Sequence, residues 1–397
     1  MSAGAGGTAA AAGGAEAGPG DQRGTGAGPG IRLGTGPGAG EELGAGFAAG
    51  DELGTRPGQG AAPALEGYLD AVAERAQGLG PEVELLVRAL RRAAGGGKRL
   101  RPRLLTAAYR SLGGTDERLA ERVAAAVELL HTAFVVHDDV IDGDDVRRGR
   151  PNVSGTFADA ATAAGASDAG ARTYATAAGI LAGDLALAGA VRAVALAGAD
   201  AGTTRRLLDM LDHAIVVSAA GELTDVRLSL GGEASLGDIL TMEEHKTAVY
   251  SFVLPLQAGA VLAGAPPATV DGLGEAGRMV GVAFQLLDDL QGVFSDEALT
   301  GKSALSDLRE GKLTPLVAHA RTTDAWPRIA PFVGDPGVTR AGAGTARELL
   351  ETCGSRRFVE DLAAGYVAAA LGVADDLGLP AELVTWVSAM TGERRAA

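Results

Sequence analysis

The feature that most limits how this chain can fold is an acidic stretch directly behind an apolar helical run. Residues 131–151 read HTAFVVHDDVIDGDDVRRGRP, so aspartates and then arginines follow the apolar side chains. Asp138 and Asp142 are four residues apart, and on a continuous α-helix they project from one face about a turn apart. Because neighbouring carboxylates repel each other, the fold must supply a cation at the end of this helix.

The residue types in this stretch favour a magnesium–diphosphate site. Mg²⁺ takes one or two protein carboxylates, keeps several waters and completes its coordination with substrate phosphates. Arg147, Arg148 and Arg150 follow the aspartates, and a guanidinium group matches phosphate oxygens in pairs. We therefore predict that the aspartates bind Mg²⁺ and that the arginines bind the phosphates, while Asp144 and Asp145 are loop carboxylates.

Composition divides the chain near residue 62. Residues 1–62 are mostly glycine, alanine, proline and threonine, with almost no large apolar side chain. They cannot bury enough surface to offset chain entropy, so we expect a disordered tail. Residues 63–397 are rich in alanine, leucine and valine at three- and four-residue spacing, which predicts an all-α fold with one large helical domain.

The overall charge and the cysteine content exclude several classes of protein. A net charge of −15 argues against a nucleic-acid partner, because binding to the phosphate backbone needs a basic face. The single cysteine, Cys353, excludes an internal disulfide and fits a reducing cytoplasm. The most apolar stretch, residues 175–202, is interrupted by Asp184 and Arg192, so we predict no transmembrane helix.

A second motif concentrates cations in this acidic chain. Three glycines, Gly95–Gly97, precede a six-residue segment with four cations, KRLRPR. Glycine lets the backbone approach a ligand, and the cations would hold an anion there. A solvated helix cap is the alternative, and the acidic motif elsewhere favours the diphosphate pocket.

Further carboxylates occur in two other predicted helices. Asp288 and Asp289 lie in an apolar sequence, where an unpaired charge is costly, so they also need a cation. Glu222 and Asp225 are three residues apart; we expect surface positions for them, with a place in the same cavity as the alternative.

Other metal and nucleotide sites fail on spacing. With Asp138 as the first residue of an EF-hand, Gly149 stands at the twelfth position, where a carboxylate is required. Glu128 and His131 form one Glu-x-x-His match, and a di-iron site needs two. No zinc-ligand spacing, Walker loop, Rossmann fingerprint or nucleophile elbow is present in the sequence.

In order and spacing, GGGKRLRP, HDDVIDGDDVRRGRP, HKTA, FQLLDDLQGVF and TGKSALSDLREGK resemble the trans-isoprenyl diphosphate synthase (polyprenyl synthetase) family. The resemblance extends over residues 64–397 and is greatest to geranylgeranyl diphosphate synthases of actinobacterial type. It implies an all-α bundle around a central cavity, a homodimer, and a Mg²⁺-dependent prenyltransferase that joins isopentenyl diphosphate to allylic diphosphates.

The resemblance also implies roles for individual residues. The implied magnesium ligands are Asp138, Asp139, Asp142 and Asp288. The implied ligands of isopentenyl diphosphate are Lys98, Arg101, His131 and Arg148. The implied contacts of the allylic diphosphate are Arg147, Lys246 and Lys302, with Thr247 and Gln285 nearby. Two positions depart from the family pattern: Gly292 replaces an aspartate of the second acidic motif, and Glu222 replaces a glutamine.

The helix before Asp138 is expected to set the length of the product. Phe134 lies one turn before Asp138, about 6 Å along the axis, where its ring would form the floor of an apolar slot beside the small Ala133. We expect a C20 product, with C15 as the alternative. A non-catalytic regulatory subunit of a heteromeric synthase would lack metal-binding or isopentenyl-binding residues, and Asp138, Lys98 and Arg148 argue against it. A terpene cyclase would not need the GGGKRLRP cations.

Overall fold

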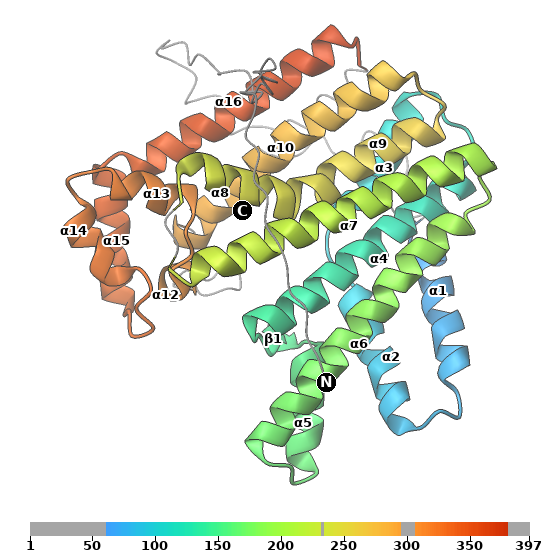
Figure 1. Ribbon diagram of the computed structural model, residues 1–397, viewed down its shortest axis with the longest axis horizontal. Helices are drawn as coiled ribbons and strands as arrows, with labels where there is room; N and C mark the ends of the chain where they lie inside the picture. The colour runs from blue at the N-terminus through green and yellow to red at the C-terminus, as the bar shows by residue number, and fades with distance from the viewer. Residues whose placement is uncertain (1–60, 232–233, 295–305, 380–397) are drawn as a thin grey trace, which may run out of the picture. The chain divides into compact units, whose positions relative to one another are not determined.

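The computed structural model describes residues 61–231, 234–294 and 306–379, and in these ranges the regular structure is almost entirely helical (Figure 1). The predicted all-α fold is therefore confirmed. The predicted disordered tail, residues 1–62, lies outside the described residues except for its last two residues, which begin the first helix. Lys302 also lies outside the described residues.

A short hairpin interrupts the succession of helices. The helices before it are α1 (Ala61–Ala76), α2 (Pro81–Ala94), α3 (Leu100–Ser111) and α4 (Glu117–Asp142). The antiparallel hairpin consists of β1 (Val146–Arg147) and β2 (Arg150–Pro151). The helices after it are α5 (Val153–Ala163), α6 (Asp168–Ala195), α7 (Ala201–Ser229), α8 (Leu236–Glu243), the π-helix η1 (Glu244–Val253), α9 (Leu254–Leu262), α10 (Pro267–Phe294), α12 (Ser306–Glu310), α13 (Pro315–Arg321), α14 (Trp326–Ile329), the 3₁₀-helix η2 (Ala330–Phe332), α15 (Arg340–Thr352) and α16 (Ser355–Asp376).

Helix α4 carries the first acidic motif and packs along α6, α1 and α3. The side chain of Asp116 caps its N-terminus by accepting a hydrogen bond from the Leu119 amide. Its middle is lined by fully buried small and aliphatic residues. Gly143 ends the helix in a left-handed conformation with φ 72°, which glycine adopts without strain. The chain therefore turns sharply just after Asp142.

Glycines let α6 approach the acidic end of α4 closely. A Cβ atom at Gly179 would lie 2.2 Å from Val140 Cγ2, and one at Gly183 would lie 2.1 Å from His137 Nε2. A side chain at either position would displace Val140 or His137 of α4. The glycines that weaken α6 as an isolated helix therefore bring the two helices together.

Helix α6 is also the one helix of the described part of the chain that is long and apolar enough to cross a membrane. Of its most apolar 18-residue window, 44% is buried inside the protein. The helix packs against α4 and α5, and these contacts account for part of its apolar character. The prediction that no helix spans a membrane stays a prediction.

Helix α10 carries the second acidic motif and packs along α16 and η1. The π-helix η1 also packs on α7, where a Cβ atom at Gly221 would lie 2.3 Å from the Lys246 amide nitrogen. Single π-helical turns are rare and often occur at functional sites. Here the close contact at Gly221 brings Lys246 beside the carboxylates of α7.

Candidate active site

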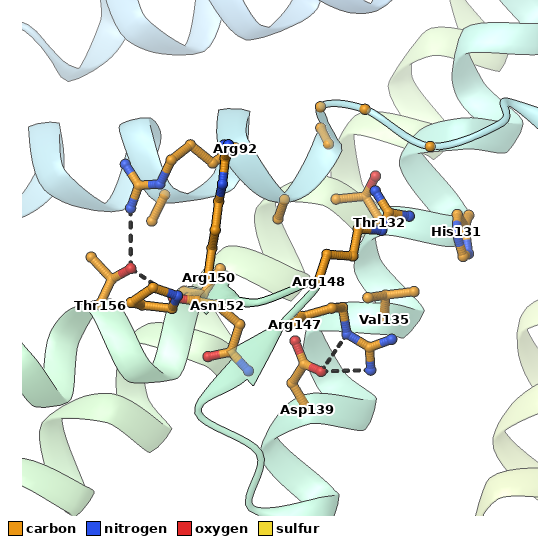
Figure 2. Close-up of a pocket in the computed structure, with 18 of the residues that line it drawn as sticks. Arg92, His131, Thr132, Val135, Asp139, Arg147, Arg148, Arg150, Asn152 and Thr156 are labelled. Atoms are coloured by element: carbon orange, nitrogen blue, oxygen red, sulfur yellow. Dashed lines mark hydrogen bonds and ion pairs between the residues drawn. The ribbon is translucent and has the colours of Figure 1, made fainter. Parts of the chain in front are cut away.

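The C-terminal end of α4 is held to the β1–β2 hairpin by charge. Asp139 is buried, with 3% of its surface exposed, while Asp138 is partly exposed. The hairpin returns Arg147, whose Nε donates to Asp139 Oδ1 at 2.7 Å (Figure 2). The Nη2 atom of Arg147 lies 3.3 Å from Asp138 Oδ2. The first arginine after the acidic motif therefore joins both aspartates.

Lys246 of η1 lies among three carboxylates. Its Nζ is 3.4 Å from Asp138 Oδ1, 3.0 Å from Glu222 Oε2 and 2.6 Å from Asp225 Oδ2. Burial lowers the pKa of Lys246, but the three carboxylates outweigh burial and raise it. The prediction that Glu222 and Asp225 are surface carboxylates is wrong, because both are only partly exposed around this lysine.

The carboxyl groups of α4 are suited to a hard cation. Burial raises the pKa of Asp139, against the hydrogen bond from Arg147 that lowers it. Burial and then the charge of Asp138 raise the pKa of Asp142, which shows that these two groups repel each other. Among the described residues, no three His, Cys, Asp or Glu side chains could hold a metal ion by themselves. A Mg²⁺ ion needs only one or two carboxylates when phosphate oxygens complete its coordination, so the donor set fits that ion.

A cavity of about 820 Å³ extends from this acidic end along the glycine run Gly95–Gly97. Cβ atoms at Gly96 and Gly97 would lie 3.4 and 3.1 Å from the guanidinium nitrogens of Arg148. His131 lines the same cavity, as do Asp139 and Arg147 (Figure 2). The structure therefore brings the two cationic motifs together, although about 50 residues separate them.

His131 faces this cavity as a neutral ring. Burial, and then the charges of the surrounding arginines, lower its pKa well below 6.5. Its Nδ1 is buried and has no hydrogen-bond partner among the residues that the structure describes. A neutral imidazole can donate one hydrogen bond without adding charge, as the predicted contact with a phosphate requires.

Two other predicted ligands of isopentenyl diphosphate point elsewhere. Arg101 donates from Nη2 to Ser251 Oγ at 2.7 Å and to the Tyr250 hydroxyl at 3.1 Å. Lys98 is exposed and does not line the cavity. Between them, Arg99 has a left-handed backbone with φ 49° and forms an ion pair with the buried Glu128 at 3.0 Å.

The two aspartates of the second acidic motif differ in exposure to solvent. Asp288 is exposed, whereas Asp289 is 9% exposed and accepts a hydrogen bond from Gln285 at 2.9 Å. Glu243 is also buried and is hydrogen-bonded to Asp289. Burial and then the charge of Asp289 raise the pKa of Glu243 well above 4.5. Asp289 therefore faces the protein interior, and Gly292 supplies no carboxylate on this helix.

Ala133 is fully buried, and the ring of Phe134 meets that of Tyr250 edge to face, with centroids 4.9 Å apart. Thr247 lies one residue after Lys246 on the same π-helix and is partly buried. The sequence argument missed Tyr250 and Glu243. Their buried positions on η1 and α8 depend on packing, and only the neighbouring HKTA motif indicated that this segment matters.

Three comparisons with known proteins agree with this geometry. A model of the polyprenyl synthetase family matches residues 83–329. The chain is 36% identical over 224 residues to a geranylgeranyl diphosphate synthase of Sulfolobus acidocaldarius. The aligned region covers 56% of this chain and 62% of that protein. It is 31% identical over 292 residues to a (2E,6E)-farnesyl diphosphate synthase of Mycobacterium tuberculosis, and this aligned region covers 72% of this chain and 75% of that protein.

A solved structure is similar over most of the chain. It is a geranylgeranyl pyrophosphate synthase from Corynebacterium glutamicum complexed with isoprenyl diphosphate and magnesium. The TM-score is 0.77 at 30% identity, covering 84% of this chain and 96% of that one.

Proposed function

Because the chain belongs to the polyprenyl synthetase family and is a prenyltransferase, we propose that it joins isopentenyl diphosphate head to tail with allylic diphosphates in a Mg²⁺-dependent reaction. The observation that supports this most is the contact between two oppositely charged groups of residues. The aspartates of α4 meet Arg147 and Lys246, and Arg147 also lines the cavity that holds His131 and Arg148.

In this proposal the cavity binds isopentenyl diphosphate. Arg148 and the neutral His131 line it, and Lys98 and Arg101, which do not line it in this structure, would have to turn toward the bound diphosphate. Arg101 must exchange Ser251 and Tyr250 for phosphate oxygens. That exchange replaces bonds between neutral hydroxyls and a cation by stronger bonds between opposite charges.

The allylic diphosphate binds between the two acidic motifs. Asp138, Asp139, Asp142 and Asp288 would hold Mg²⁺, which supplies positive charge to the leaving diphosphate. Arg147, Lys246 and Lys302 would donate hydrogen bonds to the same leaving group, with Thr247 and Gln285 nearby, although Lys302 lies outside the described residues. These groups stabilise negative charge without offering a nucleophile to the allylic cation.

The apolar wall next to Asp138 sets the product length. Phe134 and Tyr250 pack together one turn before the aspartates, and we propose that they limit the product to C20. C15 is the alternative, since the similar proteins are named for both products. A catalytically inactive regulatory subunit is disfavoured because Asp138, Asp139, Lys98, Arg101 and Arg148 are all present.

The direct test is to incubate the purified protein with Mg²⁺, isopentenyl diphosphate and dimethylallyl, geranyl or farnesyl diphosphate in turn. Chromatography of the dephosphorylated products gives their chain lengths. We expect turnover with at least one starter and a C20 end product. No turnover with any starter would reject the proposed activity.

We further propose a homodimer formed through α6 and α7. Large apolar side chains are exposed on both helices, among them Leu181 and Val191 on α6 and Val216 and Leu223 on α7. A paired surface would bury this apolar area. Light scattering during size-exclusion chromatography should give twice the mass of one chain. The cytoplasmic location and the single domain over residues 63–397 stay predictions.

A further inference from the structure

The cavity continues beyond the residues proposed to bind isopentenyl diphosphate. Past Arg148 it is lined by Arg92 at the C-terminal end of α2, Arg150 of the hairpin, and Asn152 and Thr156 at the start of α5 (Figure 2). The reaction proposed above assigns no substrate contact to any of these residues, although the sequence analysis grouped Arg150 with the phosphate-binding arginines. This end of the cavity therefore needs a separate explanation.

The charge of this outer end is not balanced by carboxylates. Arg92 donates from Nη2 to the neutral Thr156 Oγ1 at 3.1 Å, and no ion pair joins Arg92 or Arg150 to a carboxylate within the described ranges. The two acidic residues that line the cavity are engaged elsewhere, Glu128 with Arg99 and Asp139 with Arg147. Two guanidinium groups in one cavity wall repel each other unless an anion lies between them.

The first turn of α5 adds to the positive potential. This helix has 11 residues and begins at Val153, and the side chain of the preceding Asn152 caps it. Val153 and Thr156 of its first turn line the cavity. The amide groups of a helix N-terminus favour an anion. The helix terminus and the arginines therefore act on the same space.

We propose that Arg92, Arg150 and the first turn of α5 form an outer anion subsite that binds a second phosphate-bearing molecule of the diphosphate class. The proposal rests on the proposed function in that the inner pocket holds the first diphosphate. The second anion is either inorganic diphosphate released by the reaction or a second molecule of isopentenyl diphosphate.

Calorimetric titration of the full chain without divalent cations tests the subsite. Inorganic diphosphate and isopentenyl diphosphate are titrated separately into the wild-type chain and into the double variant Arg92→Gln/Arg150→Gln. The matched control is Arg88→Gln/Arg118→Gln, which removes the same charge from exposed arginines outside the cavity. A third variant, Arg92→Lys/Arg150→Lys, keeps the charge.

We expect two classes of diphosphate site in the wild type and the control. The glutamine variant should lose about tenfold to a hundredfold in affinity at one class and keep the other. The lysine variant should retain most of the affinity. If the glutamine variant loses affinity for inorganic diphosphate alone, the released group is the ligand of the subsite. If it loses affinity for both anions, isopentenyl diphosphate also binds there.

A single class of site in the wild type, or unchanged binding in the glutamine variant, would overturn the subsite. Circular dichroism confirms that each variant is folded, which is expected because both arginines are exposed. Turnover assays separate the two proposals. If the wild type turns over substrate but shows a single class of diphosphate site, the subsite alone is rejected. If it shows two classes of site but no turnover, the proposed activity alone is rejected.

Discussion

Helices α4 and α10 carry the same local pattern near their C-terminal ends. The pattern is an alanine and a phenylalanine followed after three residues by two aspartates, Ala133-Phe134 with Asp138-Asp139 and Ala283-Phe284 with Asp288-Asp289. In both helices the alanine is fully buried and the second aspartate is buried. Both phenylalanines pack on aromatic residues of η1, namely Tyr250 and Phe252.

The partners of the second aspartate differ. Asp139 accepts from Arg147, a cation that lines the cavity and can turn to a bound phosphate. Asp289 accepts from Gln285 and is hydrogen-bonded to the buried Glu243. The same spacing of alanine, phenylalanine and aspartates therefore gives a site on α4 and mainly a packed polar cluster on α10, because only α4 is followed by the arginine hairpin.

The largest effect should come from the first aspartate of each pair. Asp138→Asn should lower kcat/KM on the order of a thousandfold, since Asp138 contacts both Arg147 and Lys246. Asp288→Asn should lower it less, by about a hundredfold. Steady-state kinetics measures both, with the exposed loop residue Asp145→Asn as control. Equal losses at the two positions would show that the motifs contribute equally.

The second aspartates should differ in stability. Asp289→Leu removes the partner of the partly buried Gln285 and of the buried Glu243, so it should cost about 2–3 kcal/mol of unfolding free energy. Asp139→Leu should cost less, since Arg147 is partly exposed and can be hydrated. Urea denaturation measures both. A larger loss at Asp139 would contradict the assignment of Asp289 to the packed interior.

Substitution of Phe134 should change the product length, whereas substitution of Phe284 should change only the stability. Phe134→Ala opens the floor next to Asp138 and should shift the products to longer chains. Phe284→Ala is the matched control on α10 and should lower stability while leaving chain length unchanged. Chromatography of the products measures this. An unchanged distribution with Phe134→Ala would remove that residue from the chain-length role.

The smallest effect should be a pH dependence from Glu243. Its pKa is raised in the folded state above 4.5, so the folded chain binds more protons than the unfolded chain between these two values. The stability contribution is therefore present below pH 4.5 and is lost as pH rises toward the raised pKa, by at most ~1.4 kcal/mol per pH unit. Denaturation at several pH values should show this slope in the wild type and its absence in Glu243→Gln. If the unfolding free energies of the wild type and of Glu243→Gln change in parallel with pH, Glu243 is not the source of the slope.

Much of the site could be read from the order of residue types. The predicted resemblance to the polyprenyl synthetase family is confirmed, and the helix expected before Asp138 is observed as α4, Glu117–Asp142. The surface assignment of Glu222 and Asp225 failed. Their spacing on α7 carries no information about Gly221, whose contact with η1 brings Lys246 to them.

The sequence by itself determined the helices, the acidic motifs at two helix ends and the cationic segments, because periodicity and charge are local properties. Only the tertiary structure decided which charged groups are paired. Arg101 bonds to Ser251, 150 residues away, and Asp289 is hydrogen-bonded to Glu243 of α8. Such pairings depend on how distant helices pack, since burial sets the cost of leaving each polar group without a partner.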